Sequence, residues 1–276
     1  MQSKAYRLTG FAAVASAVGF LLRWLQGIQI IDEETGLARR GAGISAVVMV
    51  FIVLVAGALA FAAYRFGKYG TPEKPESALE TKNFLHRAVN IVPSVLLGIC
   101  GLVQLLQADA AHWGEGQILL RRILGVLTLS AAYGSFLISA GVQRKDRRRS
   151  CQIGAVLLIL FGGVWLIAIY KSVASNPVIW SFAVEVLAVC AALLAYYHLA
   201  GYFFEEPTPR RSIFYCFLGA FLCVMAAVDE HTLGESVCFA SVALHLLALG
   251  YTLTVNLGRQ EESAPDASDA PEAPEE

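Results

Sequence analysis

Eight apolar segments constrain this chain more than any other feature of its sequence. They lie near residues 8–30, 44–66, 88–107, 119–142, 152–171, 177–200, 212–228 and 235–257. A helix needs about 20 predominantly apolar residues to cross the hydrocarbon core of a bilayer. Because no water reaches the backbone there, its polar groups must be paired within a helix. We therefore predict an all-α fold, a polytopic membrane bundle of about eight transmembrane helices.

Composition divides the chain into a bundle and a tail. Of the 276 residues, 57% are hydrophobic and 16% are charged, whereas soluble domains average about 25% charged residues. We assign residues 1–258 to the bundle. Residues 259–276 are rich in alanine and proline and carry seven carboxylate side chains against one arginine. Such a segment buries too little apolar surface to fold, so we expect a disordered cytoplasmic tail.

The distribution of lysine and arginine predicts how the bundle is oriented. Cytoplasmic loops carry an excess of these residues. With the N-terminus inside, fifteen lie on the cytoplasmic side, five lie on the other side, and Arg23 falls within the first segment. The fifteen are Lys4, Arg7, Arg65, Lys68, Lys74, Lys82, Arg87, Arg144, Lys145, Arg147, Arg148, Arg149, Arg210, Arg211 and Arg259. We expect both termini in the cytoplasm and the protein in the cell membrane.

A weak parallel repeat of four helices plus four is a further hypothesis. The second and sixth segments would then correspond, and each is followed by an aromatic-rich exit that ends at a proline, Pro72 or Pro207. Membrane sequences draw on few residue types, so chance similarity is the simpler interpretation.

Three ionisable side chains lie well inside the predicted helices: Arg23, Glu185 and His245. An Arg or Asp at the centre of a membrane helix costs about 2.5–3.5 kcal/mol on insertion scales, so such residues face the bundle interior. Helical steps from each of the three reach mostly small or polar residues, which are typical of helix contacts. At 1.5 Å per residue they lie at similar depths, roughly 10–15 Å from the outer ends of their segments. We predict one polar cluster, with Arg23 and Glu185 close enough to pair.

Other polar residues extend these faces. Asn90 and Gln104 lie on a polar stripe of the third segment, and Ser241 and Thr252 share the face of His245. We consider these four as candidates for lining a cavity, with helix packing as the alternative. The cluster of Arg23, Glu185 and His245 has the same alternative, a buried pair that only fixes packing.

The sequence gives no reason to assign a catalytic residue, a metal or a cofactor. It lacks the P-loop, the zinc-protease motif, the nucleophile elbow and the dinucleotide fingerprint. Its six cysteines include no C-x-x-C pair, and we interpret them as reduced packing residues.

The lipid bilayer is the expected partner. The basic run of Arg144, Lys145, Arg147, Arg148 and Arg149 anchors the topology and is compatible with contacts to anionic headgroups. We expect no nucleic acid at so short a loop held against the membrane.

Three functional hypotheses follow. The first is a transporter or permease for a small solute or ion, in which Glu185 and His245 exchange protons, since histidine titrates near neutral pH. The second is a non-transporting membrane component: a sensor, an assembly factor or a subunit of a larger complex. The third is an intramembrane enzyme that uses Glu185 and His245 as acid and base.

The topology can be tested with reporter fusions after the last helix and in the loop near Asp109. The charge distribution predicts a cytoplasmic signal from the first fusion and a periplasmic signal from the second. The reverse signal at either site would overturn the orientation.

Overall fold

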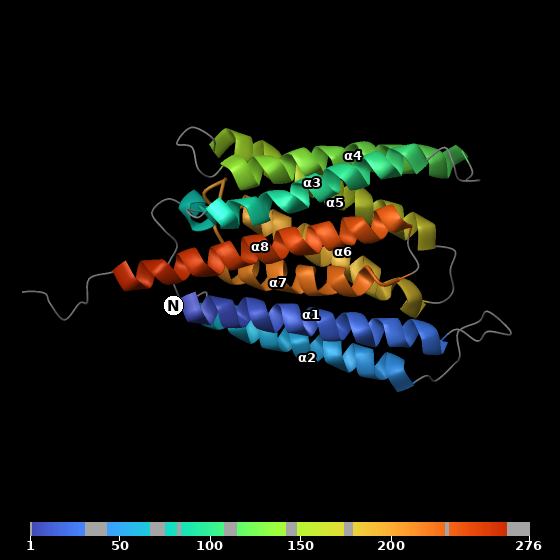
Figure 1. Cartoon of the computed structure of the whole chain (residues 1–276), viewed down its shortest axis with the longest axis horizontal. Coiled ribbons are helices and arrows are strands. Elements are labelled where there is room, and N and C mark those ends of the chain that lie inside the picture. Colours follow the sequence, from blue (N-terminus) through green and yellow to red (C-terminus); the bar gives the residue numbers. More distant parts are fainter. Residues whose placement is uncertain are drawn as a thin grey trace, which may run out of the picture.

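The computed structural model describes residues 2–30, 43–66, 75–81, 84–107, 115–141, 148–173, 179–229 and 232–263. These ranges contain eight α-helices and one short 3₁₀ helix, η1 (Figure 1). Their bounds are α1 (Gln2–Ile30), α2 (Gly43–Phe66), η1 (Pro75–Leu79), α3 (Phe84–Gln107), α4 (Glu115–Gly141), α5 (Arg148–Val173), α6 (Ile179–Ala200), α7 (Pro209–Ala226) and α8 (Leu233–Ser263).

All eight α-helices are long and apolar enough to cross a membrane, which confirms the predicted all-α bundle. Each overlaps one of the eight apolar segments, and the ends differ by at most four residues in α4, α6 and α7. Helix α8 continues past Gly258 to Ser263, whereas its candidate membrane span ends at Leu257. Residues 264–276 lie outside the described residues. The sequence analysis also missed η1, which lies between α2 and α3.

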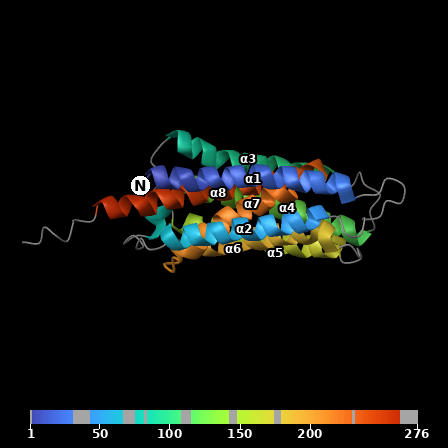
Figure 2. The same ribbon diagram turned by 90° about the horizontal axis from the view of Figure 1, so that it is seen from below.

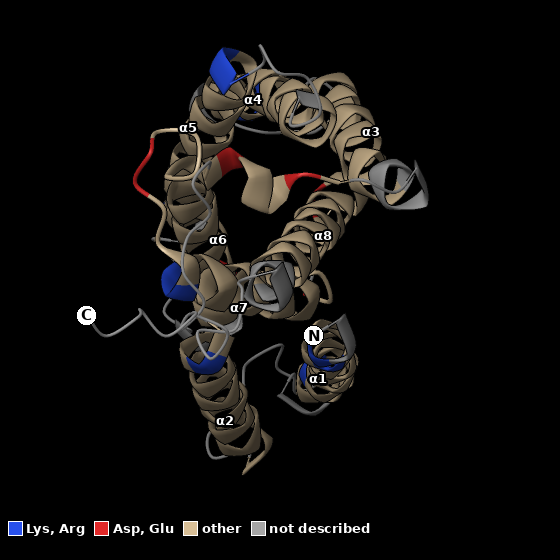
Figure 3. Ribbon diagram, turned by 90° about the vertical axis from the view of Figure 1, so that its left-hand side faces the viewer, with Lys and Arg blue, Asp and Glu red and all other residues tan. Residues whose placement is uncertain are grey.

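Six of the helices form a closed ring. In the described part of the chain, each helix from α3 to α8 packs against the next, and α8 packs back against α3. Figure 3 shows this ring end-on. A membrane bundle that closes in this way creates an interior shielded from lipid, where polar side chains can find partners.

The first two helices lie outside the ring. Helices α1 and α2 pack against each other and against α7, and α1 also contacts α8. Figure 2 shows this pair in front of the ring. In a repeat of four helices plus four, the pair α2–α3 would correspond to the pair α6–α7. Helix α6 packs against α7, whereas α2 and α3 are not among the closely packed pairs of the described residues. These contacts do not follow a repeat of four helices plus four.

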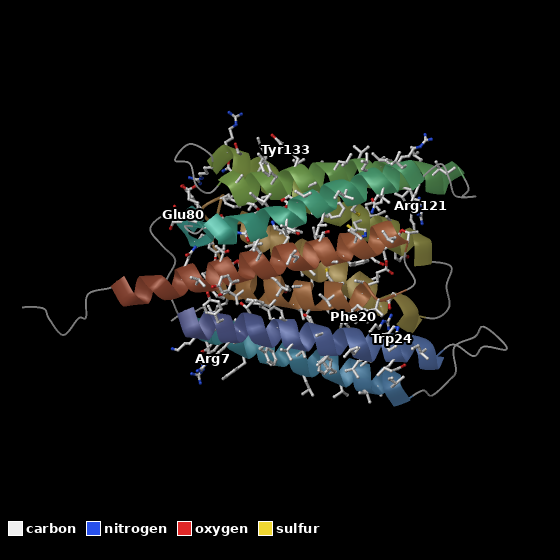
Figure 4. The ribbon with its side chains drawn as sticks, in the orientation of Figure 1. Arg7, Phe20, Trp24, Glu80, Arg121 and Tyr133 are labelled. Carbon is white, nitrogen blue, oxygen red and sulfur yellow. The ribbon has the colours of Figure 1, made fainter. Side chains whose placement is uncertain are left out.

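The helix ends divide into two groups (Figure 4). Arg7 and Glu80 lie at the end where the chain begins, and Trp24 and Arg121 lie at the other end. We call these the N-terminal end and the opposite end. The charge distribution predicts that the N-terminal end faces the cytoplasm.

Glycines allow the closest helix contact in the ring. A methyl group added to Gly154 of α5 would lie 2.6 Å from the carbonyl oxygen of Gly134 on α4, and the reverse holds for Gly134. Small residues let membrane helices approach in this way. Gly163, also on α5, has open space around it.

This contact predicts opposite outcomes for two alanine substitutions on α5. Gly154→Ala should lower the thermal stability of the purified protein, because the overpacking cost of about 1–3 kcal/mol exceeds the gain in helix propensity of about 1 kcal/mol. Gly163→Ala should leave stability unchanged or raise it. Melting curves in detergent measure both, and equal effects would contradict the close contact.

Candidate functional site: polar layers inside the ring

Arg23 is buried on α1 and holds a carboxylate that the sequence analysis missed. Its Nε donates to Asp229 Oδ1 at 2.7 Å, and its Nη2 donates to Asp229 Oδ2 at 3.0 Å. Asp229 follows the end of α7. A bidentate pair of this kind is among the stronger charge-assisted contacts in proteins. It ties the outer helix α1 to the ring.

A side-chain amide extends this contact to α2. The Nη1 of Arg23 donates to Gln26 Oε1 at 2.9 Å, and Gln26 Nε2 donates to Ser45 Oγ at 3.1 Å. The guanidinium is thus held by both a carboxylate and an amide. Helices α1, α2 and the turn after α7 are joined through one buried charge.

Glu185 lies near the same charges. It is within electrostatic range of Asp229, Glu235 and Arg23. Glu235 in turn forms an ion pair with Arg121 of α4, with 3.6 Å between Arg121 Nη2 and Glu235 Oε1. We call these five residues the charged layer. It lies at the opposite end of the bundle.

Glu235 is fixed in place by the start of α8. The backbone N–H of Thr232 donates to Glu235 Oε2 at 3.0 Å, and the backbone N–H of Glu235 donates to Thr232 Oγ1 at 3.4 Å. This is a capping box, which pairs helix-terminal donors with the side chains of a Thr-x-x-Glu sequence. The carboxylate that faces Glu185 is therefore a positioned group.

An aromatic layer separates the charged layer from the middle of the ring. Trp165 of α5 stacks on Phe161, with ring centroids 5.2 Å apart, and contacts Phe239 of α8 at 4.6 Å. All three side chains are buried. Because α5 and α8 lie on opposite sides of the ring, this contact spans the interior.

The central layer is a hydrogen-bonded chain around His245, which is 0% exposed. Its Nε2 lies 3.2 Å from Ser135 Oγ of α4, and its Nδ1 lies 3.2 Å from Tyr196 Oη of α6. Ser135 Oγ lies 2.8 Å from Ser94 Oγ of α3. Helix α3 lies between α4 and α8 in the ring, and α7 lies between α6 and α8. The contact with Ser135 therefore crosses the interior, and the contact with Tyr196 joins α8 to α6, which also pack against each other directly.

A further polar group lies toward the N-terminal end. Ser139 Oγ donates to the backbone oxygen of Asn90 at 2.9 Å, one helical turn from the pair of Ser94 and Ser135. Pro93 lies within this turn of α3 and lacks a backbone donor. Asn90 Nδ2 donates to Thr81 Oγ1 at 3.2 Å. This layer meets η1 and the residues after it.

The structure separates His245 from Arg23 and Glu185. Tyr196, which contacts His245, lies eleven residues after Glu185 on α6, which is about 16 Å along the helix at 1.5 Å per residue. The expected single cluster is therefore wrong with respect to His245. The depths of Glu185 and His245 were predicted from the ends of their own segments. Helices α6 and α8 are displaced relative to each other along their axes, so equal distances from the ends do not give equal depths. The same separation removes Glu185 and His245 as an acid–base pair acting on one substrate.

The four candidate lining residues have different surroundings. Asn90 belongs to the group next to η1, as described. Gln104 accepts a hydrogen bond from Thr128 Oγ1 at 3.1 Å. Ser241 and Thr252 donate to backbone oxygens of their own helix, at 2.6 and 2.8 Å. These two hydroxyl groups therefore donate to the backbone of α8 itself and not to a partner across the ring.

The basic run is described only in part. Arg148 donates to the backbone oxygen of Phe203 at 3.0 Å and forms an ion pair with Glu205, so it braces the turn between α6 and α7. Arg149 is exposed. Arg144, Lys145 and Arg147 lie outside the described residues.

The residues of these layers that were not found from the sequence include Asp229, Glu235, Ser135 and Tyr196. The Thr-x-x-Glu pattern before the eighth segment was a usable signal for Glu235. The hydroxyl groups of Ser135 and Tyr196 gave none, because such residues are common on membrane helices.

Comparison with models of known protein families, with curated proteins and with solved structures finds no match. Among the residues that the structure describes, no group of three or more His, Cys, Asp or Glu side chains could hold a metal ion.

The pair of Arg23 and Asp229 predicts a non-additive result in a double-mutant cycle. Arg23→Gln strands the carboxylate and Asp229→Asn strands the guanidinium. Breaking a fully buried pair costs about 3–5 kcal/mol, and each single substitution should cost less than this because Asp229 is partly exposed. The double substitution should recover part of this loss in thermal stability. The cycle of Arg23 with Glu185→Gln should show weaker coupling. Additive losses for Arg23 and Asp229 would contradict the pairing.

Proposed function

We propose that this multi-pass membrane protein is a permease for a small solute or ion, and that the proton is the ion it carries. The path runs through the interior of the ring formed by α3 to α8. The observation that supports this most is the position of His245, fully buried on α8 and hydrogen-bonded to side chains of α4 and α6.

The chemistry of the central layer supports proton transfer. Imidazole both binds and releases protons near neutral pH, and each hydroxyl both donates and accepts a hydrogen bond. Ser94, Ser135, His245 and Tyr196 form one connected chain. A proton that reaches His245 therefore has hydrogen-bonded groups on either side.

The charged layer supplies the entrance at the opposite end. Glu185 lies among two other carboxylates and the Arg23 guanidinium, so carboxylates gather where a proton would enter. In this proposal Glu185 takes up the proton, and Arg23 with Asp229 keeps the entrance in shape.

The aromatic layer acts as the barrier between entrance and centre. Apolar constrictions in membrane pores stop conduction by excluding water. Phe161, Trp165 and Phe239 are buried and in contact across the interior at this level. Transport requires their separation, so the proposal assigns the described arrangement to the closed state.

The orientation and the partners follow from the charge pattern. The N-terminal end, with Arg148 and Arg149, faces the cytoplasm and anionic lipid headgroups of the cell membrane. A sensor, an assembly factor or a subunit remains the alternative, and it predicts no ion movement through the purified protein.

Proton flux through reconstituted vesicles tests the proposal. A trapped pH-sensitive dye reports acidification, driven by a potassium gradient with valinomycin. The wild-type protein should acidify vesicles faster than empty controls. His245→Leu should lower this protein-dependent rate by at least about tenfold, as expected when a proton-transfer group is lost. Tyr196→Phe, which removes one hydroxyl, should give an intermediate rate.

Thr254→Ala is the matched control. Thr254 is also buried on α8, but its hydroxyl bonds only the backbone of its own helix. The proton flux of the Thr254→Ala variant should equal that of the wild type. Equal flux in wild-type and His245→Leu vesicles, or none above empty vesicles, would contradict the proposed function.

A further inference from the structure

We propose that η1 is the gate of this path at the N-terminal end: it plugs the ring in the described arrangement and leaves during transport, exposing a site for a small hydrogen-bond donor at Asn90. The inference rests on the proposed function.

The position of η1 is that of a plug. Figure 3 shows a short helical turn, flanked by acidic residues, lying across the near end of the ring. It contacts α8. Its Ala78 and Leu79 are buried, as is Thr81 just after it. A short surface segment buries apolar side chains in this way only where it covers other elements.

Side-chain amides hold η1 from two helices of the ring. Asn256 Nδ2 of α8 donates to the backbone oxygens of Ala78 and Glu80, at 2.9 and 2.8 Å. Asn90 Nδ2 of α3 donates to Thr81 Oγ1. None of these bonds belongs to the backbone ladder of a helix, so η1 can detach while α3 and α8 stay intact.

An unpaired hydrogen-bond acceptor on Asn90 marks the proposed site beneath η1. Asn90 is 2% exposed, and its Oδ1 has no hydrogen-bond partner among the residues that the structure describes. Buried polar atoms are nearly always paired with protein groups or water. An acceptor left open here points to a ligand that donates a hydrogen bond, such as a water molecule that passes on a proton.

The site continues into the central layer. Asn90 lies one helical turn before Ser94 on α3, and Ser139 lies one turn after Ser135 on α4. These residues form two successive rungs between α3 and α4, and the second leads to His245. When η1 leaves, the amide of Asn90 loses Thr81 and becomes available to the ligand on both its polar atoms.

The experiment combines hydrogen exchange with proton flux in the full-length protein. Asn256→Ala removes both bonds from α8 to η1. Amide exchange in residues 75–81 should become faster by about tenfold or more, the factor expected for two lost hydrogen bonds, and proton flux should rise above that of the wild type. Thr254→Ala, two residues earlier on the same helix, should change neither.

A double variant shows where the additional protons pass. Asn256→Ala with His245→Leu should lose the increased flux, because protons still need the central histidine. Flux that persists in the double variant would overturn the gate, since the leak would then bypass the ring. Leu79→Ala, which weakens the plug on its own side, provides a second test if Asn256→Ala fails to fold, with the same expected increases.

The outcomes separate the two proposals. No flux in the wild type overturns the proposed function and the gate with it. Flux in the wild type that Asn256→Ala and Leu79→Ala leave unchanged, whether or not exchange becomes faster, overturns the gate alone. Unchanged exchange in residues 75–81 has the same consequence. Faster exchange together with higher, histidine-dependent flux supports the gate.

Discussion

The hydrogen bonds of His245 depend on the closed ring, because other helices of the ring supply both of its partners. A polar side chain in the middle of a membrane bundle is costly unless it is paired. Helix α8 places the imidazole at mid-span, and α4 and α6 supply the hydroxyl groups that face its two nitrogens. These hydrogen bonds form only if α4, α6 and α8 surround one interior. The arrangement of the six helices and the central polar chain therefore depend on each other.

The outer helices depend on a different interaction. Arg23 holds α1 to the turn after α7 through Asp229, and Gln26 continues the contact to α2. The lipid-facing surfaces of α1 and α2 gain little from the hydrophobic effect inside a bilayer, because lipid is as apolar as they are. A buried charge pair and close packing against α7 therefore position this pair of helices. Arg23 and Asp229, which attach α1, belong to the charged layer that we propose as the entrance.

The fold was largely predictable from the sequence, and the site only in part. Apolar runs of bilayer length indicate helices directly, and the stripe of small residues on the first helix correctly predicted that Arg23 is buried and faces other helices. The axial positions of the helices were not predictable, because nothing in a sequence states how far one helix is displaced along another. Asp229 was missed because it follows the seventh segment, where a carboxylate resembles an ordinary loop charge. The segment η1 was not predicted because a five-residue segment that begins with a proline is too short to show a helical repeat of apolar residues.

The proposed path has a charged entrance, an aromatic barrier, a central histidine and a gate at the N-terminal end. The account requires that His245 exchange protons with water in spite of its burial. Hydrogen–deuterium exchange at the His245 ring N–H, followed by nitrogen NMR of the protein in bilayers, measures this directly. The account predicts that the ring proton exchanges readily and that Asn256→Ala accelerates the exchange. A ring proton that stays protected in both proteins would show a dry, structural histidine and contradict the account.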